Sequence, residues 1–393
     1  MNISENTTPN RLIYLRFIKN KGAVIGMFVI IAAIFVALLA YLLASDASPN
    51  ANNQITEIQL KEPGYKQNFI LQRKNTEVEK SSFLKRAWLG KPNEYKWHPY
   101  DTFEGNGDSI VIVFENSKQT LKLADIVHPL DYNQENLAGP LQLRLISGEI
   151  VQRSNPELIS DFRTKHLETK TYWLGTDKYG RDVLSRLLIG VRISLLVGLI
   201  AVIISLVIGT FLGSIAGYFG GRVDDVVMFL VNTVWSIPTL LLVFAIVLAF
   251  GKNIFNIFLA VGLTMWVDVA RIVRGQVMTL SKVEFIEAAK ISGIPTFQIV
   301  QKHLLPNILG PLTVVAAANF ATAILLEAGL SYLGFGIQPP IPSWGTMLNE
   351  NYGFAISGRP VIALVPALAI LLLVLAFNLV GNGLRDAIDV KSK

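Results

Sequence analysis

The stretch from Ala23 to Ala44 reads AVIGMFVIIAAIFVALLAYLLA and contains no charged residue. About 20 consecutive apolar residues are enough for a helix to cross the hydrocarbon core of a membrane. Arg16, Lys19 and Lys21 precede the stretch, which is also how a signal peptide begins. Because its apolar core is longer than the roughly 7–15 residues of a signal peptide, we interpret it as a retained membrane span.

Further apolar runs of similar length follow in the second half of the chain. They are Ile193–Tyr218, Val226–Phe250, Ile254–Val269, Ile308–Leu326 and Val361–Val380. Prolines such as Pro238 and Pro366 lie inside these runs, and membrane bundles tolerate them because neighbouring groups satisfy the freed backbone. Together with the first stretch, the sequence predicts six transmembrane spans.

The composition excludes several other classes of protein. Of the 393 residues, 51% are hydrophobic and only 16% are charged, whereas an ordinary soluble domain carries about 25% charged residues. There is no cysteine, and the four histidines lie far apart in the chain. The sequence therefore predicts neither a soluble protein, nor a disulfide framework, nor a metal site.

The charges predict the orientation of the spans. The segment from Asp46 to Lys170 holds 16 basic and 17 acidic residues, so the net charge of +6 comes from the remainder of the chain. The basic residues there gather before the first span, between the fourth and fifth spans, and at the C-terminus. By the positive-inside rule both termini are cytoplasmic, and the positive charge reflects orientation rather than binding to nucleic acid.

This orientation divides the chain into a cytoplasmic N-terminus (1–22), a first transmembrane helix (23–44), an extracytoplasmic insertion (45–171) and a core with five more spans (172–393). In the insertion, Ile110–Phe114 and Leu121–Leu123 flank Asn116-Ser117-Lys118, which predicts a β-hairpin, and Leu141–Leu145 alternates like a third strand. Its clustered aromatic residues are interpreted as core, or as packing against the membrane part, rather than as a ligand surface; they are Trp88, Tyr95, Trp97, Tyr100 and Phe103. The expected fold is thus all-α and polytopic, with a small β-rich insertion.

The loop before the fifth run, residues 281–306, predicts two short helices. Ser281 and Glu284 have the spacing of a capping box, while Gly293 and Pro295 are placed to end the first helix. Thr296 can cap a second helix that runs to about Leu305, and Pro306 then precedes the fifth span. On composition alone, this hairpin could equally do no more than close a loop.

The residues of this loop resemble a known motif. Glu287-Ala288-Ala289, Gly293, His303 and Leu305-Pro306 resemble the EAA loop of ABC-transporter permeases, and the run from His303 to Asn307 is typical of the dipeptide/oligopeptide/nickel branch. Other segments resemble the same branch, namely Leu174–Arg186, Gly217–Asp224, Leu325–Gly345 and Phe377–Asp386. The likeness is to the second, six-span permease subunit, and it does not extend to residues 46–170.

The resemblance implies a type I-like ABC importer permease that is not itself an enzyme. The chain indeed lacks a phosphate-binding loop, a Gly-x-Ser-x-Gly elbow and a His-Glu-x-x-His pair. It also implies two separate ATPase subunits that use the ATP, a homologous partner permease, an extracytoplasmic solute-binding protein and no cofactor in this chain. Residues Glu287 to Gly293 would form the coupling helix on the ATPase, and peptides are the expected solutes.

Charged residues inside the runs are candidates for function, because a charge in the membrane is costly. Glu327 either faces the translocation path or pairs with a basic group such as Arg192. Asp268 and Arg271 have the (i, i+3) spacing of a structural ion pair on one helix. A secondary transporter or a channel not driven by ATP is the alternative function, with Asp268 and Glu327 as its carboxylates; a membrane-anchored sensor would not need five further spans.

Overall fold

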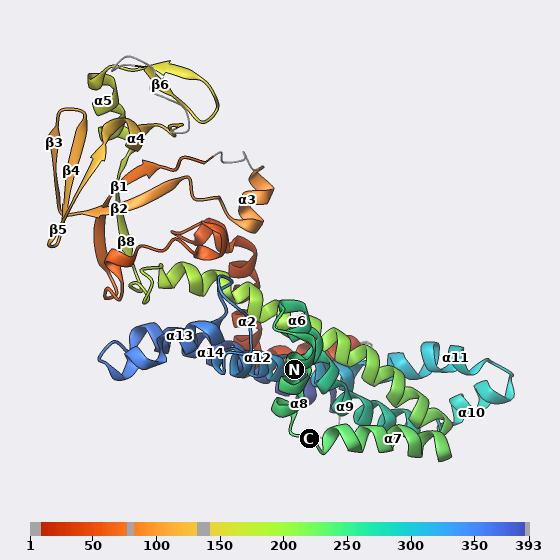
Figure 1. Cartoon of the computed structure of the whole chain (residues 1–393). Helices are drawn as coiled ribbons and strands as arrows, with labels where there is room; N and C mark the ends of the chain where they lie inside the picture. The colour runs from red at the N-terminus through yellow and green to blue at the C-terminus, as the bar shows by residue number, and fades with distance from the viewer. Residues whose placement is uncertain (1–8, 77–81, 132–141, 390–393) are drawn as a thin grey trace. The chain divides into compact units, whose positions relative to one another are not determined.

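The computed structural model describes residues 9–76, 82–131 and 142–389. The chain forms two compact units, one made of residues 1–38, 190–350 and 363–393, the other of residues 39–189 and 351–362. The unit boundaries fall within four long helices, and each unit is described by itself below. Figure 1 shows the strands gathered in the second unit, while most of the helical chain belongs to the first.

The helices confirm the predicted polytopic fold. Five described helices, or helical runs, are long and apolar enough to cross a membrane, and one bent pair brings the number to six. The membrane-type helices and their neighbours are α1 (Pro9–Lys19), α2 (Lys21–Leu43), α6 (Val183–Phe219), α7 (Gly221–Trp235), α8 (Thr239–Phe250), α9 (Ile254–Leu280), α12 (Leu305–Tyr332), α13 (Trp344–Ile356) and α14 (Val361–Ile388). The sequence patterns did not predict helix α13.

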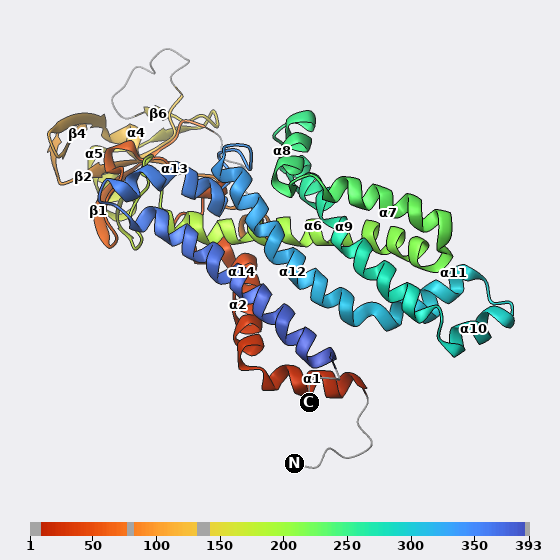
Figure 2. The ribbon, with the colours of Figure 1, turned by 90° about the horizontal axis from the view of Figure 1, so that it is seen from below.

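The predicted third span, which Pro238 interrupts, consists of two helices. The segment is broken between Trp235 and Thr239, and α7 and α8 meet at 88°, as Figure 2 shows. Pro238 is the N-cap of α8, and a proline both lacks an amide hydrogen and disfavours helical geometry in the residue before it. The proline therefore ends α7 and starts α8 in a new direction.

Glycines allow α6 and α9 to approach closely. A Cβ added to Gly213 would lie 2.5 Å from the backbone oxygen of Ala270, and one added to Gly209 would lie 2.5 Å from Cβ of Val269. The facing side of α9 is fully buried, including Val269, Val273 and Val277. Small residues at a helix interface let membrane helices pack by van der Waals contact, so this seam holds the centre of the first unit together.

Helices α1 and α2 are joined at Asn20 and pack on α14. The Asn20 side chain accepts a 3.1 Å hydrogen bond from the amide of Ala23 and donates one of 3.2 Å to Asp386. Arg16 Nη1 donates to the backbone oxygen of Ala387 at 3.5 Å. Figure 2 shows α1 turned away from α2 beside the C-terminal end of α14.

The second unit contains three small antiparallel sheets. Their strands are ordered β2-β1-β8, β3-β4-β5 and β6-β7. The strands are β1 (Tyr65–Arg73), β2 (Tyr95–Tyr100), β3 (Thr102–Asn106), β4 (Ser109–Phe114), β5 (Ser117–Lys122), β6 (Gln142–Arg144), β7 (Ile150–Gln152) and β8 (Leu167–Tyr172), with helices α3 (Phe83–Leu89), α4 (Leu123–Val127) and α5 (Asn155–Lys165) and the short turns Pro49–Ala51 and Thr56–Ile58.

The predicted hairpin is confirmed as β4 and β5, which pair from Ser109 with Lys122 to Phe114 with Ser117. The predicted third strand is present as β6, although Leu141 lies outside the described residues. Four of the five aromatic residues interpreted as core pack against the buried clusters, namely Tyr95, Trp97, Tyr100 and Phe103. Trp88 is 57% exposed, so it is not part of the core.

A buried polar cluster lies within the second unit, at the start of α6. Arg181 Nε donates a 2.6 Å hydrogen bond to Asp177, and Lys170 Nζ lies 3.8 Å from a carboxylate oxygen of Asp182. Ser185 donates to the same Asp182 carboxylate at 2.9 Å and accepts from the amide of Asp46 at 2.9 Å. These contacts join β8, the segment after α2 and the first turn of α6, so charges that would be costly alone are mutually satisfied.

Candidate functional site

The loop that resembles the EAA motif folds into a helical hairpin. Its first helix, α10, spans Glu284–Ile291 and ends with Gly293 at φ +74°. The amide of Ile294 donates to the backbone oxygen of Ala289 at 3.2 Å, and that of Gly293 donates to Lys290 at 3.0 Å. This is the Schellman pattern, in which a left-handed residue closes the helix. The predicted role of Gly293 as the helix end is confirmed.

The predicted capping box is wrong. Helix α9 extends beyond the predicted run to Leu280, and Ser281 is its C-cap, where the Ser281 hydroxyl donates to Met278 at 3.1 Å. Val283 is the N-cap of α10, and its side chain forms no cap. The preceding apolar pattern outweighed the local capping signal, because α9 buries Val273 and Val277 to its last turns.

The two faces of α10 differ. Ile286 and Ala289 are buried against residues of α9 and α12, in a cluster with Val277, Leu304 and Ile308. The opposite face is exposed, with Phe285 at 48% and Ile291 at 87%. Glu287 and Ala288 also lie on this exposed face. Large exposed apolar side chains beside a small residue are typical of a docking surface.

Lys290 fixes the angle of α10 to the rest of the first unit. Its Nζ donates to the backbone oxygen of Ser281 at 3.3 Å and lies 5.0 Å from the ring centroid of Tyr218 in α6. The hairpin is thereby tied to the C-terminal end of α9 and to α6. The contacts of Lys290 thus connect α10 with two long helices of the first unit.

The second half of the loop runs directly into α12. Helix α11 (Thr296–Ile299) is followed by a π-helical turn, Val300–Leu304. There the amide of Leu305 donates to the carbonyl of Val300. Pro306 has no amide hydrogen and would crowd the carbonyl four residues earlier in a regular helix, so the wider turn accommodates it. His303 is half-buried in this turn, and its backbone oxygen accepts from Asn307 at 2.6 Å.

Glu327 is enclosed by serines rather than paired with Arg192. The glutamate is 1% exposed and accepts a 2.7 Å hydrogen bond from Ser331. Ser331 in turn accepts from the amide of Ile337 at 3.1 Å, and Ser343 donates to Ser331 at 3.4 Å. Arg192 instead donates to the backbone oxygens of Ala37 and Leu38 in α2. Through Ser331, Glu327 is therefore connected with the chain that follows α12. The predicted pairing of Glu327 with Arg192 is wrong.

The predicted pair of Asp268 and Arg271 does not form. Arg271 donates to Asn232 at 2.8 Å and its guanidinium lies 4.0 Å from the ring centroid of Trp235, both in α7. Asp268 lies on an exposed face of α9. Arg271 reaches residues that sequence spacing could not reveal, because the bend between α7 and α8 sets the position of Trp235.

Sequence reasoning missed one ion pair that joins two helices of the first unit. Arg274 in α9 donates twice to the carboxylate of Asp224 in α7. In the sequence, Asp224 stands out only as part of a segment that resembles the family, and no spacing rule pairs residues 50 positions apart. Among the residues that the structure describes, no group of three His, Asp or Glu side chains could hold a metal ion.

Two described protein families and several known permeases are similar to this chain. Residues 209–393 match the family described as binding-protein-dependent transport system inner membrane component. Residues 8–63 match the N-terminal TM domain of oligopeptide transport permease C. The oligopeptide transport system permease protein OppC of Escherichia coli K12 is 46% identical over 222 residues, which are 56% of this chain and 73% of that protein.

The chain belongs to the binding-protein-dependent transport permeases. Two relatives from Bacillus subtilis 168 agree: OppC is 40% identical over 57% of this chain and 73% of its own length. The dipeptide transport system permease protein DppC is 42% identical over 56% of this chain and 69% of its own length. A structure of the inward-facing MetNI methionine ABC transporter aligns with 51% of this chain and 95% of that chain, at 22% identity and a TM-score of 0.41.

As a permease of this family, the chain is a multi-pass membrane component of an ABC transporter and not an enzyme. Its transport system includes an ATPase partner and a substrate-binding protein. Family membership also sets aside the alternative of a secondary transporter or channel. The exposed face of α10 lies within the matched residues 209–393, at the loop that the family resemblance predicted.

Proposed function

We propose that this permease imports short peptides, drawing energy from ATP that is bound by two partner ATPase subunits, and holds no cofactor itself. The support for peptides is the identity of 40–46% to permeases named for oligopeptide and dipeptide transport. The observation that carries the coupling mechanism is the exposed apolar face of α10, on which Ile291 is 87% exposed. Burying such a face on a partner stabilises the complex by the hydrophobic effect.

A homologous permease subunit is proposed to complete the pore. The support is the exposed stripe on α9, which carries Asp268, Gln276 and Thr279 on a helix that is otherwise largely buried. Polar and charged groups in membrane helices almost always face a bundle interior or a water-filled cavity rather than lipid. A second permease chain opposite this stripe would create such a cavity, and rigid-body motion of the two chains would alternate access.

The proposed orientation places both termini and the α10–α11 hairpin in the cytoplasm of a cell with an inner membrane. Its support is the distribution of basic residues, which gather at the termini and around this hairpin. A cysteine replacing Ser117 should react with an impermeant thiol reagent in intact cells. A cysteine replacing Ser292 should react only after the membrane is opened; the opposite pattern would reverse the topology.

The second unit is proposed to receive the binding protein or to cap the pore entrance. It lies on the side from which substrate would arrive in the proposed orientation. The two family matches end at residue 63 and resume at residue 209, so the sheets from β1 to β8 lie between them. This position in the chain fits an addition to the transporter rather than a part of its coupling machinery.

Transport by the assembled system tests the proposal. The permease, its partner subunits and the binding protein are reconstituted in proteoliposomes, and ATP-dependent uptake of labelled tri- to pentapeptides is compared with uptake of Ni²⁺. Peptide uptake that requires internal ATP is expected. Uptake of Ni²⁺ without uptake of peptide would overturn the substrate assignment while leaving the coupling mechanism intact.

A pair of variants tests the coupling surface. Ile291→Asp places a charge on the exposed face of α10 and should release the ATPase subunits from the purified complex, without loss of the folded permease. The matched control is Leu248→Asn, which changes a side chain that is 55% exposed on α8, away from the hairpin. Retention of the ATPase by Ile291→Asp at the level of the control would overturn the proposed docking face.

A further inference from the structure

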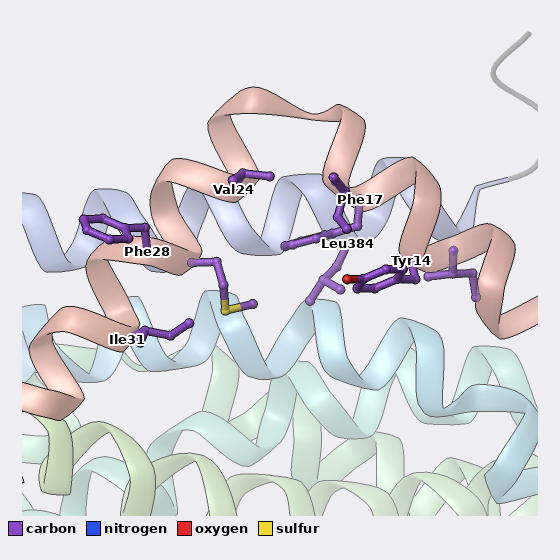
Figure 3. Close-up of a pocket in the computed structure, with 9 residues that line it drawn as sticks. Tyr14, Phe17, Val24, Phe28, Ile31 and Leu384 are labelled. Carbon is purple, nitrogen blue, oxygen red and sulfur yellow. The ribbon is translucent and has the colours of Figure 1, made fainter.

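An open apolar groove lies where α1 meets α2. It has a volume of about 640 Å³ and is lined by residues of α1, α2 and α14, within the range of roughly 300–1,000 Å³ that is usual for ligand sites. Figure 3 shows Tyr14 and Phe17 of α1, Val24, Phe28 and Ile31 of α2, and Leu384 of α14 around this groove. The remaining lining residues, Ile13, Ile18 and Met27, are also apolar.

The groove is built by the sharp turn at Asn20 rather than by loose packing. Asn20 binds both the first turn of α2 and Asp386 of α14. On the other side of α2, Gly26 lies so close to α14 that an added Cβ would be 2.6 Å from the backbone oxygen of Ala376. Because α2 is held against α14 and α1 is turned aside, their remaining apolar faces diverge and leave the space open.

Three of the lining side chains are strongly exposed. Phe28 is 72% exposed, Tyr14 61% and Ile31 57%. Water against these side chains would be unfavourable. Since α2 is one of the candidate membrane spans, the part of the groove that follows α2 opens toward lipid chains.

The charges that α1 and the start of α2 place beside the groove are all basic. The chain from Pro9 to Ala44 carries Arg11, Arg16, Lys19 and Lys21 and no acidic residue. Arg11, Lys19 and Lys21 are exposed, whereas Arg16 donates to the C-terminal end of α14. Asp386 of α14 accepts a hydrogen bond from Asn20. A basic amphipathic segment next to a membrane span attracts anionic lipids by about 1 kcal/mol for each basic residue.

We propose that this groove binds one acyl chain of an anionic phospholipid, whose phosphate lies near Arg11, Lys19 and Lys21. The apolar lining takes the chain, and the exposed cations take the headgroup. Helix α1 then lies in the membrane interface with its apolar side toward the lipid and its basic side toward the headgroups. The bound lipid would fill the space between α1 and α2 and hold the N-terminal helix against α14.

The proposal is tested on the full-length permease in nanodiscs of phosphatidylcholine. A trace of phosphatidylglycerol or phosphatidylcholine, each with a photoreactive diazirine on one acyl chain, is added, and labelled peptides are mapped after irradiation. Labelling of residues 9–31 should be about 30- to 140-fold stronger with the anionic lipid, as expected for two or three nearby cations at about 1 kcal/mol each. Equal labelling by both lipids would overturn the assignment of an anionic lipid.

Two matched variants separate a built site from general lipid contact. Val24→Trp fills the groove and should lower labelling several-fold, while Ile25→Trp adds the same ring on a part of α2 that does not line the groove and should not. The charge variant Arg11→Gln/Lys19→Gln/Lys21→Gln should remove the preference for the anionic lipid. Lys96→Gln/Lys118→Gln/Lys122→Gln, with the same loss of charge in the second unit, should keep it. Equal labelling of the two tryptophan variants would overturn the proposal.

Other occupants of the groove give distinct outcomes. Inorganic phosphate in excess should not compete with the labelled lipid, and competition by it would show that an anion site without an acyl chain is present. A further control is deletion of residues 2–8 in wild type and in Val24→Trp. If this deletion increased lipid labelling equally in both proteins, the N-terminal residues and not lipid would occupy the groove, which would contradict the proposal. If the partner permease covered it, labelling would disappear in the assembled transporter and appear only in the isolated chain, which would contradict the proposal as well.

Discussion

Arg274 in α9 donates two hydrogen bonds to the carboxylate of Asp224 in α7. The two side chains are 50 residues apart in the chain and are only 29% and 12% exposed. Arg271, three residues earlier, also binds α7, through Asn232 and Trp235. Helix α7 is therefore held to α9 along one side by two arginines, before the chain bends by 88° into α8.

Asp224→Asn should loosen α7 while leaving the remainder of the first unit folded. The substitution removes one charge of a bidentate pair, and a hydrogen bond to a charged group is worth about 1.5–3 kcal/mol. Hydrogen exchange should become faster in residues 221–235. Asp225→Asn, at the exposed neighbouring position, is the control. Protection in Asp224→Asn equal to that of the control would show that the ion pair does not hold the helix.

Replacement of Gly293 by asparagine should reduce coupling less than replacement by valine. Gly293→Asp should also reduce coupling, because it adds a charge at the proposed ATPase contact. The φ of +74° at Gly293 is left-handed, and a Cβ there would meet nothing within 4 Å, so the cost is conformational rather than steric. An L-residue in this region costs about 1–2 kcal/mol, with asparagine the mildest case. Peptide-stimulated ATP hydrolysis should fall in the order wild type, Gly293→Asn, Gly293→Val, while membrane insertion stays unchanged. Wild-type coupling in Gly293→Val and Gly293→Asp would contradict the importance of this helix end.

The sheets of the second unit should be removable. The amide of Gly64 donates to the backbone oxygen of Tyr172 at 2.9 Å, so the chain enters and leaves the sheets at adjacent points. Excising residues 65–172 and joining Gly64 to Trp173 with a short Gly-Ser linker preserves the contact of Thr176 with Ile58 at 2.6 Å. Membrane insertion and ATPase assembly should persist, whereas transport or docking of the binding protein should weaken.

The excision needs transport measured at both limiting and saturating peptide. Loss at limiting peptide alone would indicate a role in receiving the binding protein, and loss at both would indicate a role at the pore entrance. Unchanged transport at both concentrations would refute the proposed role of this unit. A variant in which the same linker replaces residues 83–89 alone keeps the sheets and serves as the control.

Acid should destabilise the second unit through its buried histidines. Burial lowers the pKa of His98, the nearby charge of Lys96 lowers it further, and the hydrogen bond with Gln119 opposes the shift. Burial likewise lowers the pKa of His166, with Leu71 accepting from its ring and opposing the shift. The unfolded chain therefore binds protons first as pH falls below about 6.5, so this stability is present above that pH and is lost as pH falls through the lower folded-state pKa.

Hydrogen exchange in β1 and β2, corrected for the intrinsic effect of pH, measures this loss. Protection should decrease between pH 7 and pH 5, and His98→Gln should show a smaller decrease because glutamine does not titrate. His303→Gln, in the other unit, should behave as wild type. A pH dependence that is identical in His98→Gln and wild type would remove His98 from the explanation.

Local patterns of residues were sufficient to predict the class of the protein and the end of the first helix of the loop. Apolar runs such as Ala23–Ala44 must be helical in a membrane, because only a helix or a closed barrel satisfies backbone groups there. The alternation around Asn116 determined the β4–β5 hairpin, and the glycine at 293 determined the end of α10. These features depend on interactions within a few residues, so the local order of residues was sufficient to predict them.

The tertiary structure decided which distant groups meet. Asp268 and Arg271 have the spacing of a helical pair, yet Arg271 binds Asn232 because α7 lies beside α9. The sequence could not predict that serines surround Glu327, because Ser343 contacts Ser331 only as a result of the path of the chain after α12. Ser281 has the spacing of an N-terminal cap but is the C-cap of α9, because burial along that helix outweighs one cap. Such partners depend on how helices are bent and packed, which no rule based on sequence spacing contains.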